Sequence, residues 1–149
     1  MAVFVINEWL WADSSGQNLR QPQRETFNFI SQLPSSTHQI VFIEGSAFDQ
    51  KAWALCKSAD PIVAAIASAF VRSVRINSDR CLILKAETAA VAIPENLASE
   101  TNPDDHYLLW AMLCVRDSIL VTTDGPLREA VTKAGLSCLS REEFLRTYF

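Results

Sequence analysis

Oxygen-bearing side chains recur at four places in the chain, each just after an apolar run or at the start of a helical segment. Carboxylates gathered in one place repel one another unless a cation lies among them. Hard divalent cations such as Mg²⁺ and Mn²⁺ take oxygen ligands, and a water bound to such a metal can attack a phosphodiester. We therefore expect metal-dependent phosphodiester chemistry. The side chains concerned are Asn7, Glu8, Glu44, Asp49, Asp104, Asp105 and Asp124.

Five short runs of β-branched and other apolar residues predict the strands that position these side chains. Most are apolar at every position, which is typical of parallel strands covered on both faces. In parallel sheets, ligands bind beyond the carboxyl ends of the strands, where the strand order reverses. We therefore expect the acidic positions to share one rim. The predicted strands are Val3–Ile6, Ile40–Ile43, Cys81–Leu84, Ile119–Thr122 and Leu136–Leu139.

Helical signals fill the gaps between these runs. Pro22 predicts the first residue of a helix, because proline is tolerated at that position. The segment 47–75 predicts two helices broken near Pro61. Strands that alternate with helices predict an α/β fold with a parallel sheet and right-handed crossovers. No composition shift marks a boundary, so we expect one domain over residues 1–149. Further helix starts are predicted at Asn102, at Pro126 and at the capping box Ser140–Glu143.

The C-terminal half carries a resemblance to a known family. Asn102-Pro-Asp-Asp-His-Tyr-Leu-Leu-Trp-Ala-Met, followed by Ser118-Ile-Leu-Val-Thr-Thr-Asp124-Gly-Pro-Leu127, resembles part of a PIN domain. That family has an acid that opens a helix, then an apolar strand ending in a threonine-and-aspartate turn. The resemblance implies a three-layer fold whose five-stranded parallel sheet has the order 3-2-1-4-5. Many members are metal-dependent ribonucleases, including the toxins of toxin–antitoxin pairs.

The same resemblance implies roles for individual residues at the end of the motif. Asp105, or its neighbour Asp104, and Asp124 would be metal ligands. Thr122 or Thr123 would be a supporting hydroxyl. Taken singly, each acid also has a structural explanation, because acids are favoured at helix starts and in turns. Their joint fit to one rim favours the functional interpretation.

The first half of the chain departs from the family pattern. PIN domains usually carry an aspartate at the end of the first strand, where this chain has Asn7. Glu8 is adjacent, but neighbouring side chains point in different directions. The family's second acid, a glutamate after the second strand, would correspond to Asp49, with Glu44 as the alternative.

Two functions from different classes follow. The first is an endoribonuclease that uses Mg²⁺ or Mn²⁺, and the family adds a toxin role with an antitoxin partner and a homodimer. The second is a PIN-like module that no longer cleaves and serves in binding or as a scaffold, which Asn7 favours. A receiver-like or flavodoxin-like domain is a weaker third interpretation, because Asn7 and Glu8 make a poor acidic pair and no glycine-rich phosphate loop is present.

Composition limits these functions without choosing between them. The net charge of −4 argues against a protein that holds RNA by charge alone, yet it is compatible with a carboxylate cluster. No apolar run is long enough to cross a bilayer, so we expect a soluble, cytoplasmic protein without membrane contact. The four cysteines are widely spaced, which indicates core thiols instead of a zinc site or a disulfide framework.

Two further groups of side chains have a structural and a functional interpretation. Large aromatic side chains usually pack in the core or at an interface. Trp9 and Trp11, which follow the first strand, are the pair that we expect at the surface, where indoles can stack on bases. A basic stretch precedes and follows the third strand. It is interpreted as a solvated face, with phosphate guiding as the alternative. Its members are Arg72, Arg75, Arg80 and Lys85.

Overall fold

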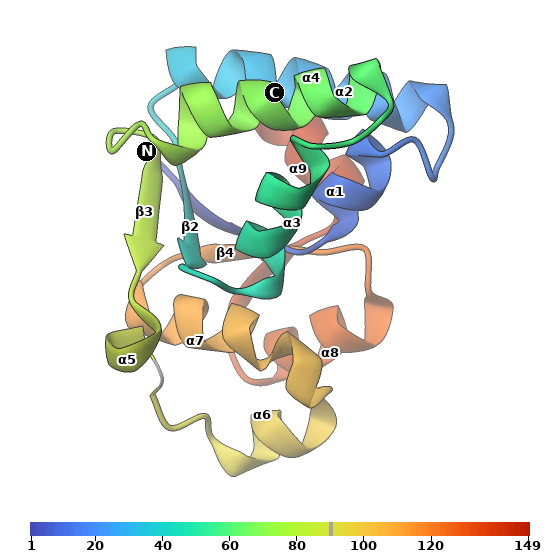
Figure 1. The fold of residues 1–149 in the computed structure, drawn as a ribbon. Helices are drawn as coiled ribbons and strands as arrows, with labels where there is room; N and C mark the ends of the chain where they lie inside the picture. Colours follow the sequence, from blue (N-terminus) through green and yellow to red (C-terminus); the bar gives the residue numbers. More distant parts are fainter. Residues whose placement is uncertain (90) are drawn as a thin grey trace.

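The structure is a computed structural model that describes residues 1–89 and 91–149. Its centre is a parallel sheet with the strand order β3-β2-β1-β4-β5, which confirms the predicted topology (Figure 1). Each strand end lies within one residue of its predicted position. The strands are β1 (Val3–Ile6), β2 (Gln39–Ile43), β3 (Cys81–Leu84), β4 (Ile119–Val121) and β5 (Ser137–Leu139).

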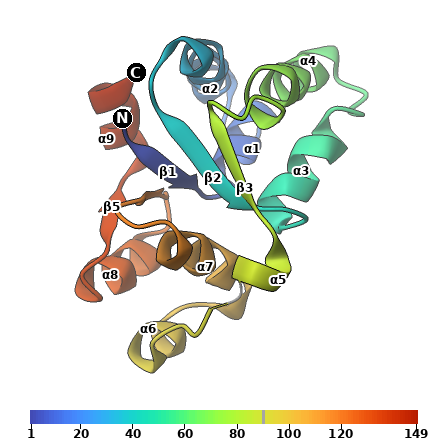
Figure 2. The ribbon, with the colours of Figure 1, turned by 90° about the vertical axis from the view of Figure 1, so that its left-hand side faces the viewer.

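Helices cover both faces of the sheet, as Figure 2 shows from the side. Side chains alternate along each strand, so that Phe4 and Ile6 of β1 enter one core cluster and Val5 enters the other. One face carries α1 (Trp9–Ser14), α2 (Arg20–Gln32), α3 (Ala47–Leu55), α4 (Pro61–Phe70) and α9 (Arg141–Tyr148). The other carries α5 (Ala86–Ala89), α6 (Glu95–Glu100), α7 (His106–Cys114) and α8 (Gly125–Lys133).

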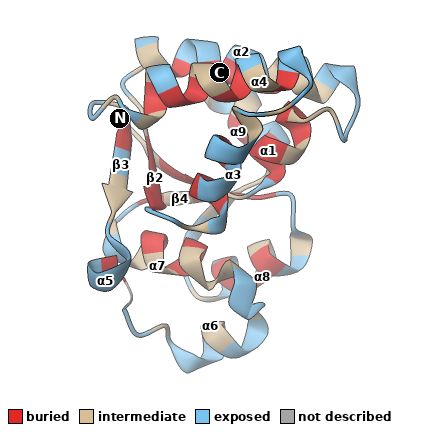
Figure 3. Ribbon diagram, in the orientation of Figure 1, coloured by how far each residue is buried: buried red, intermediate tan, exposed pale blue. Residues whose placement is uncertain are grey.

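Three short turns of other helical types complete the chain. They are η1 (Leu33–Ser35) and η3 (Pro103–Asp105), which are 3₁₀ turns, and η2 (Val71–Arg75), a π turn that continues α4. Figure 3 shows that buried residues concentrate on the strands and on the helix faces turned toward them. None of the helices within the described ranges has the length and apolar character that a bilayer span requires.

Most helix starts are where the sequence predicts them. Asp60 caps α4, and its side chain accepts from the backbone N–H groups of Ile62 and Val63. Ser140 caps α9 by accepting from the N–H of Glu143. Asn102 accepts from the N–H of Asp104, so the predicted start at Asn102 is a 3₁₀ turn that leads into α7.

The predicted start of α2 at Pro22 is wrong. The helix begins at Arg20, and Pro22 lies within its first turn, where a missing N–H costs no intrahelical hydrogen bond. Leu19 occupies the N-cap position without a side-chain cap bond and has a positive φ of 77°. Proline therefore marked the first turn, not the first residue.

The surface position expected for Trp9 and Trp11 is also wrong. Both lie in α1, a six-residue helix, and are 5% and 0% exposed. The indole N–H of Trp9 donates to the carbonyl oxygen of Val121 at 3.0 Å, and that of Trp11 donates to Phe48 at 3.0 Å. Because each polar N–H has a backbone partner, the large rings can be buried at no cost in hydrogen bonding.

Candidate functional site

Asn7 and Thr122 meet where the strand order reverses. The chain passes from β1 to β2 and β3 on one side of the sheet, and then returns to place β4 on the other side of β1. Asn7 follows β1, and its Nδ2 donates to Oγ1 of Thr122, just after β4, at 2.9 Å. The backbone N–H of Asp124 donates to the same oxygen at 3.0 Å. This is the position at which parallel sheets bind ligands.

The amide of Asn7 joins the ends of the two central strands. Its Oδ1 accepts from the backbone N–H of Glu8 at 2.6 Å, while its Nδ2 donates to the buried hydroxyl of Thr122. An ionised aspartate has no N–H or O–H to donate, so it could contact Thr122 only by accepting from the threonine hydroxyl, with the direction of the bond reversed. Asparagine at this position therefore has a structural role of its own.

Glu8 and Asp124 are neighbours of this amide, because the Glu8 N–H donates to Asn7 and the Asp124 N–H donates to the same threonine oxygen as Asn7. Burial raises the pKa of the Asp105 carboxyl, and the nearby negative charges of Asp124, Glu8 and Asp104 raise it further. The pKa of Tyr107 is raised by burial and by the charges of Glu8 and Asp105.

We name the set Asn7, Glu8, Asp105, Thr122 and Asp124 the β1–β4 rim. None of its three carboxylates forms an ion pair with a basic side chain within residues 1–89 and 91–149. Asp104 and Thr123 are exposed neighbours of the rim residues Asp105 and Asp124. The hydrogen bonds thus link Asn7, Glu8, Thr122 and the backbone of Asp124.

Asp49 and Glu44, the two candidates for the second acid, are engaged by basic side chains. Asp49 is 2% exposed, and its Oδ1 and Oδ2 accept from Nε and Nη2 of Arg75 at 2.8 and 3.1 Å. The backbone N–H of Gly45 also donates to Oδ2 at 2.9 Å. Glu44 pairs with Lys85 at 2.8 Å near the surface. Both oxygens of Asp49 therefore already have partners.

The basic stretch does not form one solvated face. Arg75 has a side chain that is only 14% exposed, because it neutralises buried Asp49. Its guanidinium lies 5.1 Å from the ring centroid of Trp53 and 5.9 Å from that of Phe42. The interpretation as a solvated face is wrong for Arg75, and it holds for Lys85, which is 68% exposed.

The donor set of the rim suits a hydrated cation. Among the residues that the structure describes, no three His, Cys, Asp or Glu side chains form a group that could hold a metal ion. A Mg²⁺ ion, however, keeps several waters and needs only one or two carboxylates directly. Burial, and then the charges of Asp124, Glu8 and Asp104, raise the pKa of Asp105, and a nearby cation would act in the opposite direction. Asp105 and Asp124 fit that requirement, with Glu8 as an outer carboxylate.

Sequence reasoning missed Tyr107 as a member of this neighbourhood. The Oη of Tyr107 and the Nε2 of His106 are buried and have no hydrogen-bond partner within the described residues. Buried polar atoms usually find a partner in protein, water or ligand. The available signal was the position of Tyr107 in the first turn of α7, two residues after Asp105.

Comparison of the chain with models of known protein families gives no match, and comparison with curated proteins also gives none. The likeness to PIN domains therefore depends on residues 102–127 and on the strand order.

Replacing Asp105 by asparagine is expected to stabilise the protein at neutral pH. Because the pKa of Asp105 is raised on folding, its ionised form disfavours the folded state above that pKa, and the penalty disappears as pH falls below the unfolded value. Asp105→Asn should raise Tm at pH 7 by about 1–2 °C, since the partly exposed carboxyl is screened and the gain stays below about 1 kcal/mol. Thermal melts of both proteins between pH 3 and 8 should converge at low pH. A lower Tm for the variant at pH 7 would contradict the proposed repulsion.

Proposed function

We propose that the protein is a metal-dependent endoribonuclease that hydrolyses RNA phosphodiesters at the β1–β4 rim. The observation that carries this proposal is the pair of hydrogen bonds by which the Asn7 side chain and the backbone N–H of Asp124 both donate to Oγ1 of Thr122, at the ends of the two central strands. The carboxylates of Glu8, Asp105 and Asp124 have no basic partner within residues 1–89 and 91–149. They belong to segments at the edge where parallel sheets bind ligands. The resemblance of residues 102–127 to PIN domains supports RNA as the substrate.

The residues of the rim have distinct tasks in this proposal. Asp105 and Asp124 hold Mg²⁺ or Mn²⁺, and Glu8 adds negative charge beside them. When bound, the metal supplies an acidified water as nucleophile and neutralises charge on the leaving oxygen. Thr122 positions Asp124 by accepting its backbone N–H, and Asn7 in turn orients the threonine hydroxyl by donating to it.

The family resemblance extends the proposal to the biological setting. A toxin role would bring an antitoxin protein as partner, and a homodimer would widen the surface available to RNA. The chain itself carries a net charge of −4, so RNA would be held chiefly by contacts at the rim and not by a general positive field.

A second candidate is a PIN-like module that binds or scaffolds without cleaving. Two observations favour it. Asn7 uses its amide to join β1 to β4, and the carboxylate of Asp49 is neutralised by Arg75. Two of the four positions that the family uses for acids thus offer no free carboxylate.

Metal dependence tests the first candidate against the second. Incubation of a labelled, mixed-sequence single-stranded RNA with purified protein and Mn²⁺ or Mg²⁺ should give shorter products, and EDTA should abolish them. Thermal melts in the same buffers should show that Mn²⁺ raises Tm, because ligands that bind only the folded state stabilise it. A rise in Tm without cleavage would favour the non-cleaving module. No change in either measurement would refute a metal site at the rim.

A further inference from the structure

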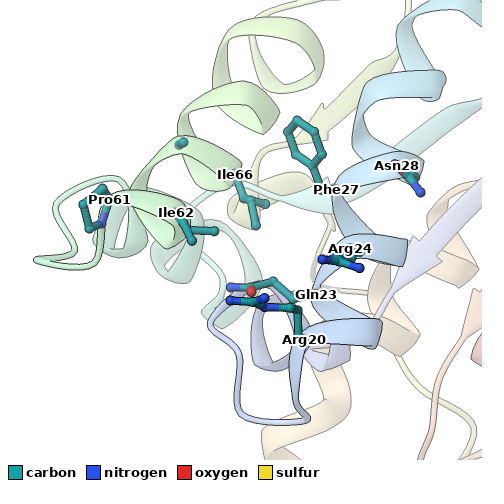
Figure 4. Close-up of a pocket in the computed structure, with 9 residues that line it drawn as sticks. Arg20, Gln23, Arg24, Phe27, Asn28, Pro61, Ile62 and Ile66 are labelled. Carbon is teal, nitrogen blue, oxygen red and sulfur yellow. The ribbon is translucent and has the colours of Figure 1, made fainter.

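An open groove of 540 Å³ lies between α2 and α4, on the sheet face that carries the N-terminal helices (Figure 4). Arg20 and Arg24 line it from α2, and Ile62 and Ile66 line it from α4. In the close-up, the two isoleucines reach from α4 toward the side chains of α2, and Phe27 stands at one end. Ligand pockets in proteins commonly measure about 300–1,000 Å³, so the groove has the capacity for a small molecule.

The walls of the groove are largely apolar and partly open to solvent. Phe27 is 43% exposed and Ile62 is 56% exposed, which places both among the exposed large hydrophobic residues of the protein. Ile66 forms part of the floor and is only 3% exposed. Two exposed apolar side chains that face the same groove from different helices form a surface that an apolar ligand would cover.

The charge of the groove is opposite to that of the whole chain. Arg20 and Arg24 are four positions apart on α2, where like charges repel. No acidic side chain lines the groove, and neither guanidinium forms an ion pair in the part of the chain that the structure describes. A protein with a net charge of −4 thus presents two uncompensated positive charges beside an apolar wall.

We propose that this groove binds a small amphipathic anion, namely an alkyl or aryl carboxylate. The carboxylate lies between Arg20 and Arg24, where two guanidinium groups offer charge-assisted hydrogen bonds. The apolar body lies along Phe27, Ile62 and Ile66. This site is separate from the β1–β4 rim and does not depend on the proposed nuclease activity.

Anilinonaphthalene sulfonate, which joins an anionic group to an aromatic body, is the probe for this site. Its fluorescence should rise saturably with the folded protein, and decanoate should displace it. The double variant Arg20→Gln, Arg24→Gln should weaken binding by about tenfold. Ala65→Trp should abolish it, because Ala65 is an exposed lining residue whose enlargement fills the groove without disturbing the core. Arg116→Gln, which changes an exposed arginine outside the groove, should leave binding unchanged.

Three outcomes would overturn the proposal. Equal affinity for the uncharged analogue N-phenylnaphthylamine would show that the arginines do not select an anion. Unchanged binding to the Ala65→Trp variant, with its fold verified by circular dichroism, would place the probe elsewhere. A dimer in sedimentation experiments that Ala65→Trp dissociates would show that a second copy of the chain covers the groove instead.

Discussion

Asp124→Asn is expected to lower the rate of Mn²⁺-dependent RNA cleavage by about 100-fold or more, a loss of the size seen when one group that stabilises a transition state is removed. The carboxylate of Asp124 is exposed at the rim, has no basic partner within the described ranges, and contributes to the raised pKa of Asp105. Its replacement removes one of the two negative charges that would hold the metal.

This substitution separates chemistry from folding, because Asp124 also caps α8. Its Oδ1 accepts from the backbone N–H of Leu127 at 3.1 Å. Asparagine caps helices about as well as aspartate, so the variant should keep its fold and nearly its full Tm. Single-turnover cleavage of labelled RNA and a thermal melt measure the two effects.

Asp60→Asn is the matched control for this experiment. Like Asp124, Asp60 caps a helix that has proline in its first turn. Its Oδ1 accepts from the N–H of Ile62 at 2.9 Å. The control makes the same change of charge at another helix cap, and it should leave cleavage unchanged. Equal cleavage by the wild type and Asp124→Asn would remove Asp124 from the site. Equal losses in the two variants would trace the effect to helix capping.

The largest effect on stability is expected from Arg141→Ala, which should lower the free energy of unfolding by about 3–5 kcal/mol. Arg141 is 7% exposed, and its Nε donates to Oδ2 of Asp13 at 2.6 Å. Asn18 donates to the other oxygen of Asp13 at 2.7 Å, and the guanidinium lies 5.5 Å from the centroid of Trp9. Truncation leaves the carboxylate of Asp13 buried without its counter-ion, so Tm should fall by about 10 °C.

An exposed ion pair provides the comparison for this variant. Lys133 pairs with Glu100 at 2.9 Å, but the two side chains are 74% and 44% exposed. Lys133→Ala should cost less than about 1 kcal/mol, because solvent screens such pairs. Urea denaturation of both variants measures the difference. The double variant Asp13→Leu, Arg141→Met should recover much of the loss, since it removes both buried charges. Failure to recover would show that packing, not an unpaired charge, causes the destabilisation.

The five strands were predictable because each carries its own signal, whereas their order was implied by the resemblance to PIN domains. Every strand is a separate apolar run, and the alternation with helices restricts how parallel strands can be connected. The helix α1 lacked such a signal, because six residues directly after a strand are too few to display a helical period. Trp9 and Trp11 were misplaced for the same reason.

The candidate site was predictable where its residues lie close in sequence and not where they are far apart. Asp105 and Asp124 belong to two motif segments, 102–112 and 118–127, that lie close together in the sequence. The partners of Asp49 and Asp13 are 26 and 128 positions away, and no local pattern reveals such pairs. From the sequence, Asn7 is a position that lacks the negative charge of the family's aspartate. That its side-chain N–H donates to Thr122 is visible only in the folded structure, where the ends of β1 and β4 lie together.

The 115 positions between Asn7 and Thr122 bear on the synthesis of the protein. A chain that leaves the ribosome N-terminus first has β1, β2 and β3 available before β4, because these three strands precede β4 in the sequence. Until residues 119–124 emerge, one edge of β1 stays unpaired, and Asn7 cannot donate to Thr122. The hydrogen bonds between Asn7, Thr122 and Asp124 therefore form only after β4 has been synthesised and has paired with β1.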